Sequence, residues 1–125
     1  MRKIHTLKLF DAETIIAGGD TESNVLDLDF DYHAAGYFSF QIALTGDGTA
    51  KIEYLLSNDG VNYLEPSSAA DIVLAHTKVS GPGTDGKDIY SFQPEIARYM
   101  KIKITETGAA DAITVTGFIA IQADH

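Results

Sequence analysis

Apolar and polar side chains alternate with a period of two through most of this chain, and that alternation constrains its fold more than any other feature. Every second residue is apolar in 26–32, in 38–44 and in 100–104. A strand places such residues on one face, whereas a helix would scatter them around its axis. No segment shows the period of about 3.6 residues that marks an amphipathic helix. The sequence therefore predicts an all-β fold.

Turn signals at close intervals divide the chain into about eight short strands. That spacing is typical of an antiparallel β-sandwich, of jelly-roll or immunoglobulin-like type, and we expect a single domain over residues 1–125. The strands are predicted at 4–10, 26–32, 38–44, 52–56, 61–64, 89–92, 100–104 and 113–121, with a weaker segment at 72–74.

Two of the turns predict hairpins. The short connection after 26–32 predicts that this strand pairs with 38–44. The turn Asn58-Asp59-Gly60 predicts a short return strand at 61–64, because glycine takes the positive φ that hairpin loops require. Gly117 is expected at a bulge or at a point of close approach.

The charge of the chain narrows the class of partner. It has a net charge of −9 and a pI near 4.6. Phosphate backbones and anionic membranes repel such a surface, so neither nucleic acid nor a membrane is an expected partner. With no cysteine, neither a disulfide nor a thiolate metal site can form. Lys8 and His5 interrupt the apolar core that a signal peptide needs, so we expect synthesis in the cytoplasm.

Two groups of aspartates raise the question of calcium. The three aspartates within 27–31 have the spacing that opens an EF-hand, but its later glycine and glutamate are missing, so a solvated strand face is the simpler interpretation. Asp59, Asp85 and Asp88 lie in or beside loops, where most aspartates only bond their own backbone. No metal ligands are predicted.

The motifs of catalysis are missing from the sequence. The histidines, at positions 5, 33, 76 and 125, are not at ligand spacing, and no G-x-S-x-G elbow occurs. The glycine-rich segment 80–87 lacks the strand–loop–helix setting of a phosphate loop. We therefore assign no catalytic or cofactor-binding residue and predict that the protein is not an enzyme. A small hydrolase stays open as an alternative, because the spacing of a carboxylate pair is three-dimensional.

One basic cluster is a candidate interface. It consists of Arg98, Lys101 and Lys103 with the neighbouring aromatic Tyr99. Cross-strand pairing with the acidic row 27–31 is the simpler interpretation. In an oligomer the same basic residues would dock on the acidic residues of a neighbour.

Tyrosines and loop carboxylates are the candidates for a ligand site. Tyr37, Tyr63 and Tyr90 are predicted to be exposed, where they would stack on sugars or fill an interface. Tyr63 closes the turn that contains Asp59, so these two are the first candidates for ligand contact.

Two segments carry a resemblance to known families. Ser57-Asn58-Asp59-Gly60-Val61-Asn62-Tyr63 resembles a hairpin of small β-sandwich virion proteins of tailed bacteriophages, and more weakly one of discoidin-like sandwiches. The late strand 97–105, the Thr107-Gly108 turn and the final strand 113–121 fit the phage pattern. Discoidin-like domains are longer, often have a disulfide, and usually have tryptophan where Tyr63 stands.

The phage resemblance implies a non-enzymatic virion structural protein, most simply a capsid decoration or accessory protein. It implies a homo-oligomer, with a trimer favoured, contacts to other virion proteins, and a place in the virion after synthesis in the host cytoplasm. Loops 17–24 and 78–87 are candidate contact elements. The alternative is a carbohydrate- or cell-surface-binding module that uses Tyr63 and Asp59, with or without calcium. No cofactor is implied.

Overall fold

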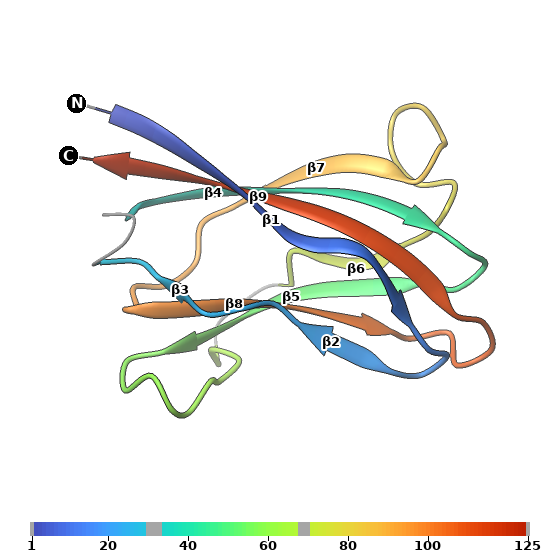
Figure 1. Cartoon of the computed structure of the whole chain (residues 1–125), viewed down its shortest axis with the longest axis horizontal. Helices are drawn as coiled ribbons and strands as arrows, with labels where there is room; N and C mark the ends of the chain where they lie inside the picture. Colours follow the sequence, from blue (N-terminus) through green and yellow to red (C-terminus); the bar gives the residue numbers. More distant parts are fainter. Residues whose placement is uncertain (1, 30–33, 68–70, 125) are drawn as a thin grey trace.

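The computed structural model describes residues 2–29, 34–67 and 71–124, and shows two antiparallel β-sheets packed face to face (Figure 1). One sheet has the strand order β1-β9-β4-β7, and the other has the order β2-β8-β5-β6 with β3 also paired to β8. The predicted all-β antiparallel sandwich is confirmed. The strands are β1 (Arg2–Ile15), β2 (Asp20–Glu22), β3 (Leu26–Asp27), β4 (Ala34–Thr45), β5 (Ala50–Ser57), β6 (Val73–His76), β7 (Lys87–Phe92), β8 (Tyr99–Glu106) and β9 (Ile113–Asp124).

Strands β2 and β3 are two parts of one interrupted strand. Both pair with β8, and the pairing shifts by one residue between Glu22 and Leu26. Ser23 fills the break, because its N–H donates to the carbonyl of Ile102 (2.8 Å) and its Oγ accepts from the N–H of Ile102 (3.0 Å). When β2 and β3 count as one strand, the two sheets have the strand order of a jelly roll.

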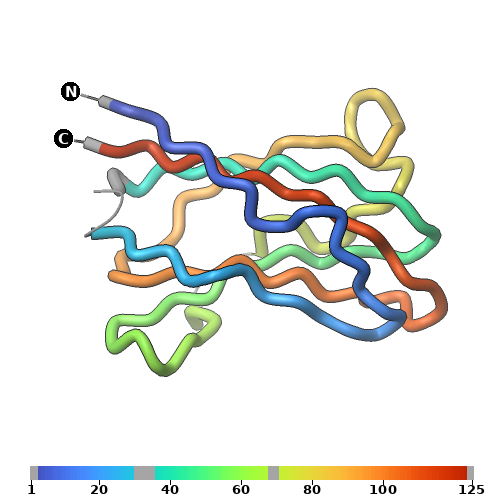
Figure 2. The backbone as a smooth tube through the Cα atoms, in the orientation of Figure 1, coloured from blue at the N-terminus to red at the C-terminus, as the bar shows by residue number. Residues whose placement is uncertain are grey.

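The first and last strands lie side by side, as Figure 2 shows for the two ends of the chain. Their pairing runs from Arg2 opposite Asp124 to Ile15 opposite Ile113, with two register shifts in β1. Strand β4 pairs with the other side of β9. No helix in the described residues is long and apolar enough to cross a membrane.

The inner faces of the two sheets form one apolar core. Phe10 and Phe40 meet edge to face, with ring centroids 6.2 Å apart. A Cβ on Gly117 would lie 2.5 Å from Cζ of Phe40, so the predicted close approach at this glycine is confirmed. The other fully buried large side chains are Ile15, Ile42, Leu44, Ile52, Met100, Ile102, Ile104, Ile113, Ile119 and Ile121.

The predicted hairpin between 26–32 and 38–44 is wrong. Leu26 lies opposite Met100 in one sheet, whereas Phe38 lies opposite Ile121 in the other. The strand at 26–32 is limited to two residues before a turn, and 30–33 lie outside the described residues. Both segments turn an apolar face to the same core from opposite sides, and alternation cannot tell a pair of neighbours from a pair that faces each other.

Two further predictions need correction. The return strand at 61–64 is a single bridge between Leu56 and Leu64, with Val61 and Leu64 exposed. The loop predicted at 17–24 contains strand β2, because its backbone completes the ladder of β8. The weak segment at 72–74 becomes β6.

Candidate functional site

The loop 57–66 folds around the carboxylate of Asp59. Its Oδ1 accepts from the N–H of Val61 (2.8 Å), the N–H of Asn62 (2.8 Å) and Oγ of Ser57 (2.9 Å), and its Oδ2 accepts from Nδ2 of Asn62 (2.8 Å). These bonds, first those from Asn62 and Val61, hold the pKa of Asp59 well below its usual range. Asp59 therefore shapes the turn, and its oxygens already have partners.

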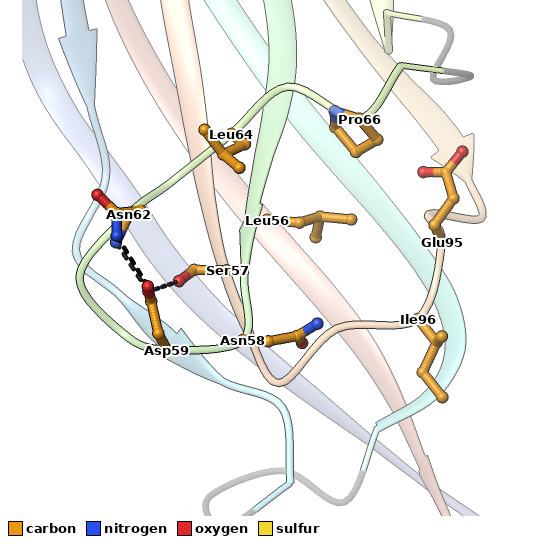
Figure 3. Close-up of a pocket in the computed structure, with 9 residues that line it drawn as sticks. All are labelled: Leu56, Ser57, Asn58, Asp59, Asn62, Leu64, Pro66, Glu95 and Ile96. Atoms are coloured by element: carbon orange, nitrogen blue, oxygen red, sulfur yellow. Dashed lines mark hydrogen bonds between the residues drawn. The ribbon is translucent and has the colours of Figure 1, made fainter.

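An open hollow of about 730 Å³ lies beside this loop (Figure 3). The segment 95–96 forms its other side, and Leu56 lies between the two sides. Ile96 is 99% exposed, so the hollow presents an apolar side chain to solvent. Its lining combines apolar Leu56, Leu64, Pro66 and Ile96 with polar Ser57, Asn58, Asp59, Asn62 and Glu95.

Glu95 is fixed at the rim by a buried tyrosine. The hydroxyl of Tyr54 donates to Oε2 of Glu95 (2.9 Å), and the Tyr54 ring stacks on Phe92 with centroids 5.7 Å apart. Burial, and then the bond to Glu95, raises the pKa of Tyr54 to about 12. No sequence pattern marks Glu95 or Ile96, because only the fold brings them beside the loop 57–66.

The basic cluster lies on the outer face of the sheet that contains β8, and its charges are paired. Arg98 lies 3.5 Å from Asp27, as cross-strand pairing with the acidic row predicted. Lys101 instead lies 3.4 Å from Glu22, and its Nζ is 4.3 Å from the ring centroid of Tyr63. The exposed part of this cluster is therefore a mixed surface of both signs.

Lys103 and Tyr99 complete the cluster. Lys103 lies between Glu22 and Glu53 in the register of the sheet. The guanidinium of Arg98 is 5.3 Å from the ring centroid of Tyr99. Pairs of this kind hold neighbouring strands together, and each exposed pair contributes little to stability.

The loop aspartates considered for calcium are not brought together. The loop 57–66 and the loop 78–86 lie at opposite ends of the sandwich in Figure 1. Asp85 and Asp88 each accept from a nearby backbone N–H, at 3.2 and 2.7 Å. With Asp59 also occupied, these three residues serve local turns.

Among the described residues, a different group of carboxylates gathers on the outer side of β5. Oxygens of Glu53, Glu65 and Asp71 all lie within 4.8 Å of one another. Lys51 supplies the local positive charge, with Nζ 3.9 Å from Glu53 and 3.7 Å from Asp71. Burial raises the pKa of Glu53, and Lys51 opposes that effect. The sequence did not predict this group, because its members come from separate strands and loops.

Glu106 ties three loops together at the end of the sandwich opposite the hollow (Figure 1). It is 1% exposed. Oε1 accepts from the N–H of Gly18 (3.0 Å) and Ala109 (2.7 Å), and Oε2 accepts from that of Thr49 (2.8 Å) and Gly108 (2.7 Å). These bonds, first the one from Thr49, lower the pKa of Glu106 to about 2.

The tyrosines predicted to be exposed differ in environment. Tyr37 is 54% exposed. Tyr63 and Tyr90 are both half-buried, so that prediction is wrong for these two. Lys101 covers the ring of Tyr63, and Tyr63 does not line the hollow.

Tyr90 packs against the core. Its hydroxyl lies 2.7 Å from Nδ1 of His76, and Nε2 of this buried histidine lies 2.8 Å from the carbonyl of Gly86. The carbonyl can only accept, so Nε2 carries a proton.

Sequence comparison identifies no relative. No protein-family model matches the chain, and no curated protein matches it.

Solved structures share the fold. VP2 of infectious bursal disease virus, in a subviral particle, overlaps 98% of this chain and 33% of its own, with a TM-score of 0.60 and 10% identity. PorU from Porphyromonas gingivalis overlaps 98% of this chain and 12% of its own, with a TM-score of 0.51 and 11% identity. PirA overlaps 95% of this chain and 92% of its own, with a TM-score of 0.47 and 17% identity. The likeness to VP2 and to PorU is one of fold, and the class that it defines is the antiparallel β-sandwich.

Proposed function

We propose that this protein is a non-enzymatic structural component of a virus particle, namely a capsid decoration or other accessory protein. Each copy buries a modest surface on a symmetric lattice, and many such contacts together resist dissociation. The protein is made in the host cytoplasm and enters the virion through contacts with other copies and with other virion proteins.

The observation that carries this proposal is that carboxylates fix the loops at both ends of the sandwich. Glu106 accepts four backbone hydrogen bonds at one end, and Asp59 shapes the loop at the other. Loops held in one conformation lose little entropy when they dock on a partner. Rigid loops on a rigid β framework suit a protein that works by contact.

The fold is compatible with this role. The likeness to VP2 extends over 98% of this chain, and that VP2 was solved as a subviral particle. At 10% identity the likeness is one of fold, so the role itself needs an experimental test.

The test is to count copies of the protein in particles purified from a lysate of cells that produce the virus. Quantitative mass spectrometry should find many copies per particle, and gold-labelled antibody should mark a regular position on the particle. An abundant host protein of the same lysate is the control for contamination. If the protein is present in the lysate but absent from the purified particles, the proposal is refuted.

A second candidate function is glycan binding in the hollow beside loop 57–66. The observation that favours it is the mixed lining, in which amide and carboxylate groups surround apolar Leu64 and Ile96. Such a lining offers hydrogen bonds to hydroxyls and contact to the apolar face of a sugar ring.

A glycan array, read with and without a chelator, tests this second function. Ile96→Asp should abolish binding, because Ile96 lines the hollow and is exposed enough to be replaced without loss of folding. Leu74→Asp is the matched control, since Leu74 is also exposed but does not line the hollow. Binding that survives Ile96→Asp, or no binding to any glycan, rejects the hollow as a glycan site.

A further inference from the structure

The geometry points to the outer face of the β1-β9-β4-β7 sheet as a contact surface for a second copy of this chain. We call it the acid-free face, and it consists of the outward residues within 4–8, 39–45, 87–91 and 114–122. Register fixes which residues point outward, because they alternate with the buried residues of the same strands. This inference rests on the proposed function, since it names one of the contacts through which copies associate.

The composition of the acid-free face is unlike that of the rest of the molecule. The chain has 18 acidic residues, yet none of the outward residues in these ranges is Asp or Glu. Most are Thr, Ser, Ala or Gln, and the charged ones are Lys8 and Lys87, which lie on the two edge strands β1 and β7. Asp11, from the β1 bulge, lies outside these ranges and bonds Lys8 (3.1 Å). Depletion of charge at the centre is one part of the compositional signal of a protein interface, and the aromatic ring of Phe118 is another.

The opposite outer face provides an internal comparison. Its register places Glu22, Lys103 and Glu53 in one row, and Asp20 and Lys51 flank β8 in another. Two copies that met through this face would have to separate its ion pairs or bring like charges together, which is costly. The outer faces of the two sheets therefore differ in charge, and only the acid-free face can meet a second copy without this cost.

The net charge of the chain also bears on where a second copy would bind. Each copy has a net charge of −9, so two copies repel one another through most of their surfaces. The acid-free face is where they can approach with the least repulsion. Its two lysines lie on the edge strands, and the ammonium group of Lys8 lies over the ring of Phe118, 5.5 Å from the ring centroid.

The centre of the face is suited to packing of sheet on sheet. Phe118, half-buried, lies in one row with Lys8 and Gln41, and Gln41 in turn lies opposite Ile89. Ile89 is 59% exposed. In a two-fold contact, this row meets the same row of the partner at about the 10 Å spacing of stacked sheets.

The size of the face fits a weak dimer. Four strands about 4.8 Å apart, over about eight residues of about 3.3 Å each, give roughly 500 Å² per copy and roughly 1,000 Å² in total. That total is at the lower limit for a specific interface, so a dissociation constant in the micromolar range is expected. A face-to-face contact closes with two copies, so this surface favours a dimer over the trimer that the phage resemblance implies.

Sedimentation equilibrium of the full chain tests the inference. Wild-type protein should dimerise, and more tightly at about 0.5 M than at about 0.05 M salt, because salt screens the repulsion between two acidic copies. Gln41→Glu changes an exposed amide into a carboxylate of the same shape at the centre of the face. It should weaken dimerisation at least tenfold, and adding Ala120→Glu should abolish it. Circular dichroism checks that each variant is folded.

The matched control places the same charges on the other sheet, as Thr105→Glu with the exposed Leu74→Glu. It should leave the dissociation constant within about twofold of the wild-type value, once the added net charge is screened at about 0.5 M salt. A wild-type protein that stays monomeric, or an oligomer that tolerates Gln41→Glu, overturns the inference. An equal loss of dimerisation in the control variant also overturns the inference. None of these results alters the count of copies in purified particles, which tests the proposed function separately.

Discussion

Replacing Gly117 with alanine tests how the core is packed. Gly117 lies in β9 with its missing side chain toward the interior, where the ring of Phe40 occupies the space. A Cβ there would lie 2.5 Å from Cζ and 2.9 Å from Cε1 of Phe40, and 3.1 Å from Cδ2 of Phe10. Both rings are buried, at 0% and 2% exposure, so neither can swing into solvent.

The magnitude follows from two opposing effects. Overpacking of a core costs about 1–3 kcal/mol. Alanine also lowers the conformational entropy of the unfolded chain, which stabilises the folded state by about 0.4–1 kcal/mol. The 2.5 Å approach to a fully buried ring places Gly117→Ala in the upper half of the overpacking range, so it should lower the free energy of unfolding by about 1–2 kcal/mol. A chain of this length has an unfolding entropy of about 0.26 kcal/mol/K, so the Tm should fall by about 4–8 °C.

A double-mutant cycle identifies the cause. Phe40→Leu shortens the side chain that the new methyl group meets, so Gly117→Ala should cost at least about 1 kcal/mol less in that background than in wild type. Gly83→Ala is the control, because Gly83 lies in an exposed loop, where the atoms nearest to an added Cβ belong to the flexible side chain of Asp85. It should change the Tm by no more than about 2 °C. Additive effects of the two core substitutions, or an unchanged Tm for Gly117→Ala, would refute the packing argument.

Three further predictions concern carboxylates. Glu106→Gln should destabilise the protein strongly at pH 7 and flatten its acid denaturation, measured by thermal melts from pH 7 to 2. The pKa of Glu106 is about 2 in the folded state, against an ordinary value of 4.5, so its contribution to stability is complete above pH 4.5 and is lost as the pH falls toward 2. Acid denaturation that is unchanged by the substitution would contradict this. Lys51→Met should lower the Tm more at pH 7.5 than at pH 4.5. Burial raises the pKa of Glu53 and so disfavours its charged form, which Lys51 stabilises and which is more populated at pH 7.5. An equal loss of Tm at both pH values would argue against the pairing. Asp59→Ala should speed proteolysis within loop 57–66 with little change in Tm, and a loop as resistant as in wild type would show that its hydrogen bonds do not hold it.

The fold class could be predicted from the sequence because alternation is a local signal. Strands β4, β5, β8 and β9 fall close to their predicted ranges, since each turns alternate apolar residues to the core and each ends near a turn. The choice of partner strand could not be predicted in the same way. Two alternating strands fill one core equally well as neighbours in one sheet or as strands of the two opposite sheets. The contacts that decide between these arrangements join residues far apart in the sequence, so no local pattern predicts them.

The candidate site was predictable only in part. The turn at Asp59 was readable because a side chain bonds its own loop there. The hollow was not, since Ile96 and Glu95 come from a separate segment. The role of Glu106 could not be predicted for the same reason. A glutamate in a strand of alternating residues is expected to face solvent, and the backbone groups that bind Glu106 come from three loops that only the fold brings together.

The measurement that tests the central claim most directly is the solution mass by light scattering across a range of concentrations, with calcium and with a chelator. A chain of 13.5 kDa that acts through association between copies should approach twice that mass as concentration rises, and calcium should make no difference. A mass of 13.5 kDa at every concentration, with a Tm that rises when calcium is added, would contradict the account and favour a ligand-binding module.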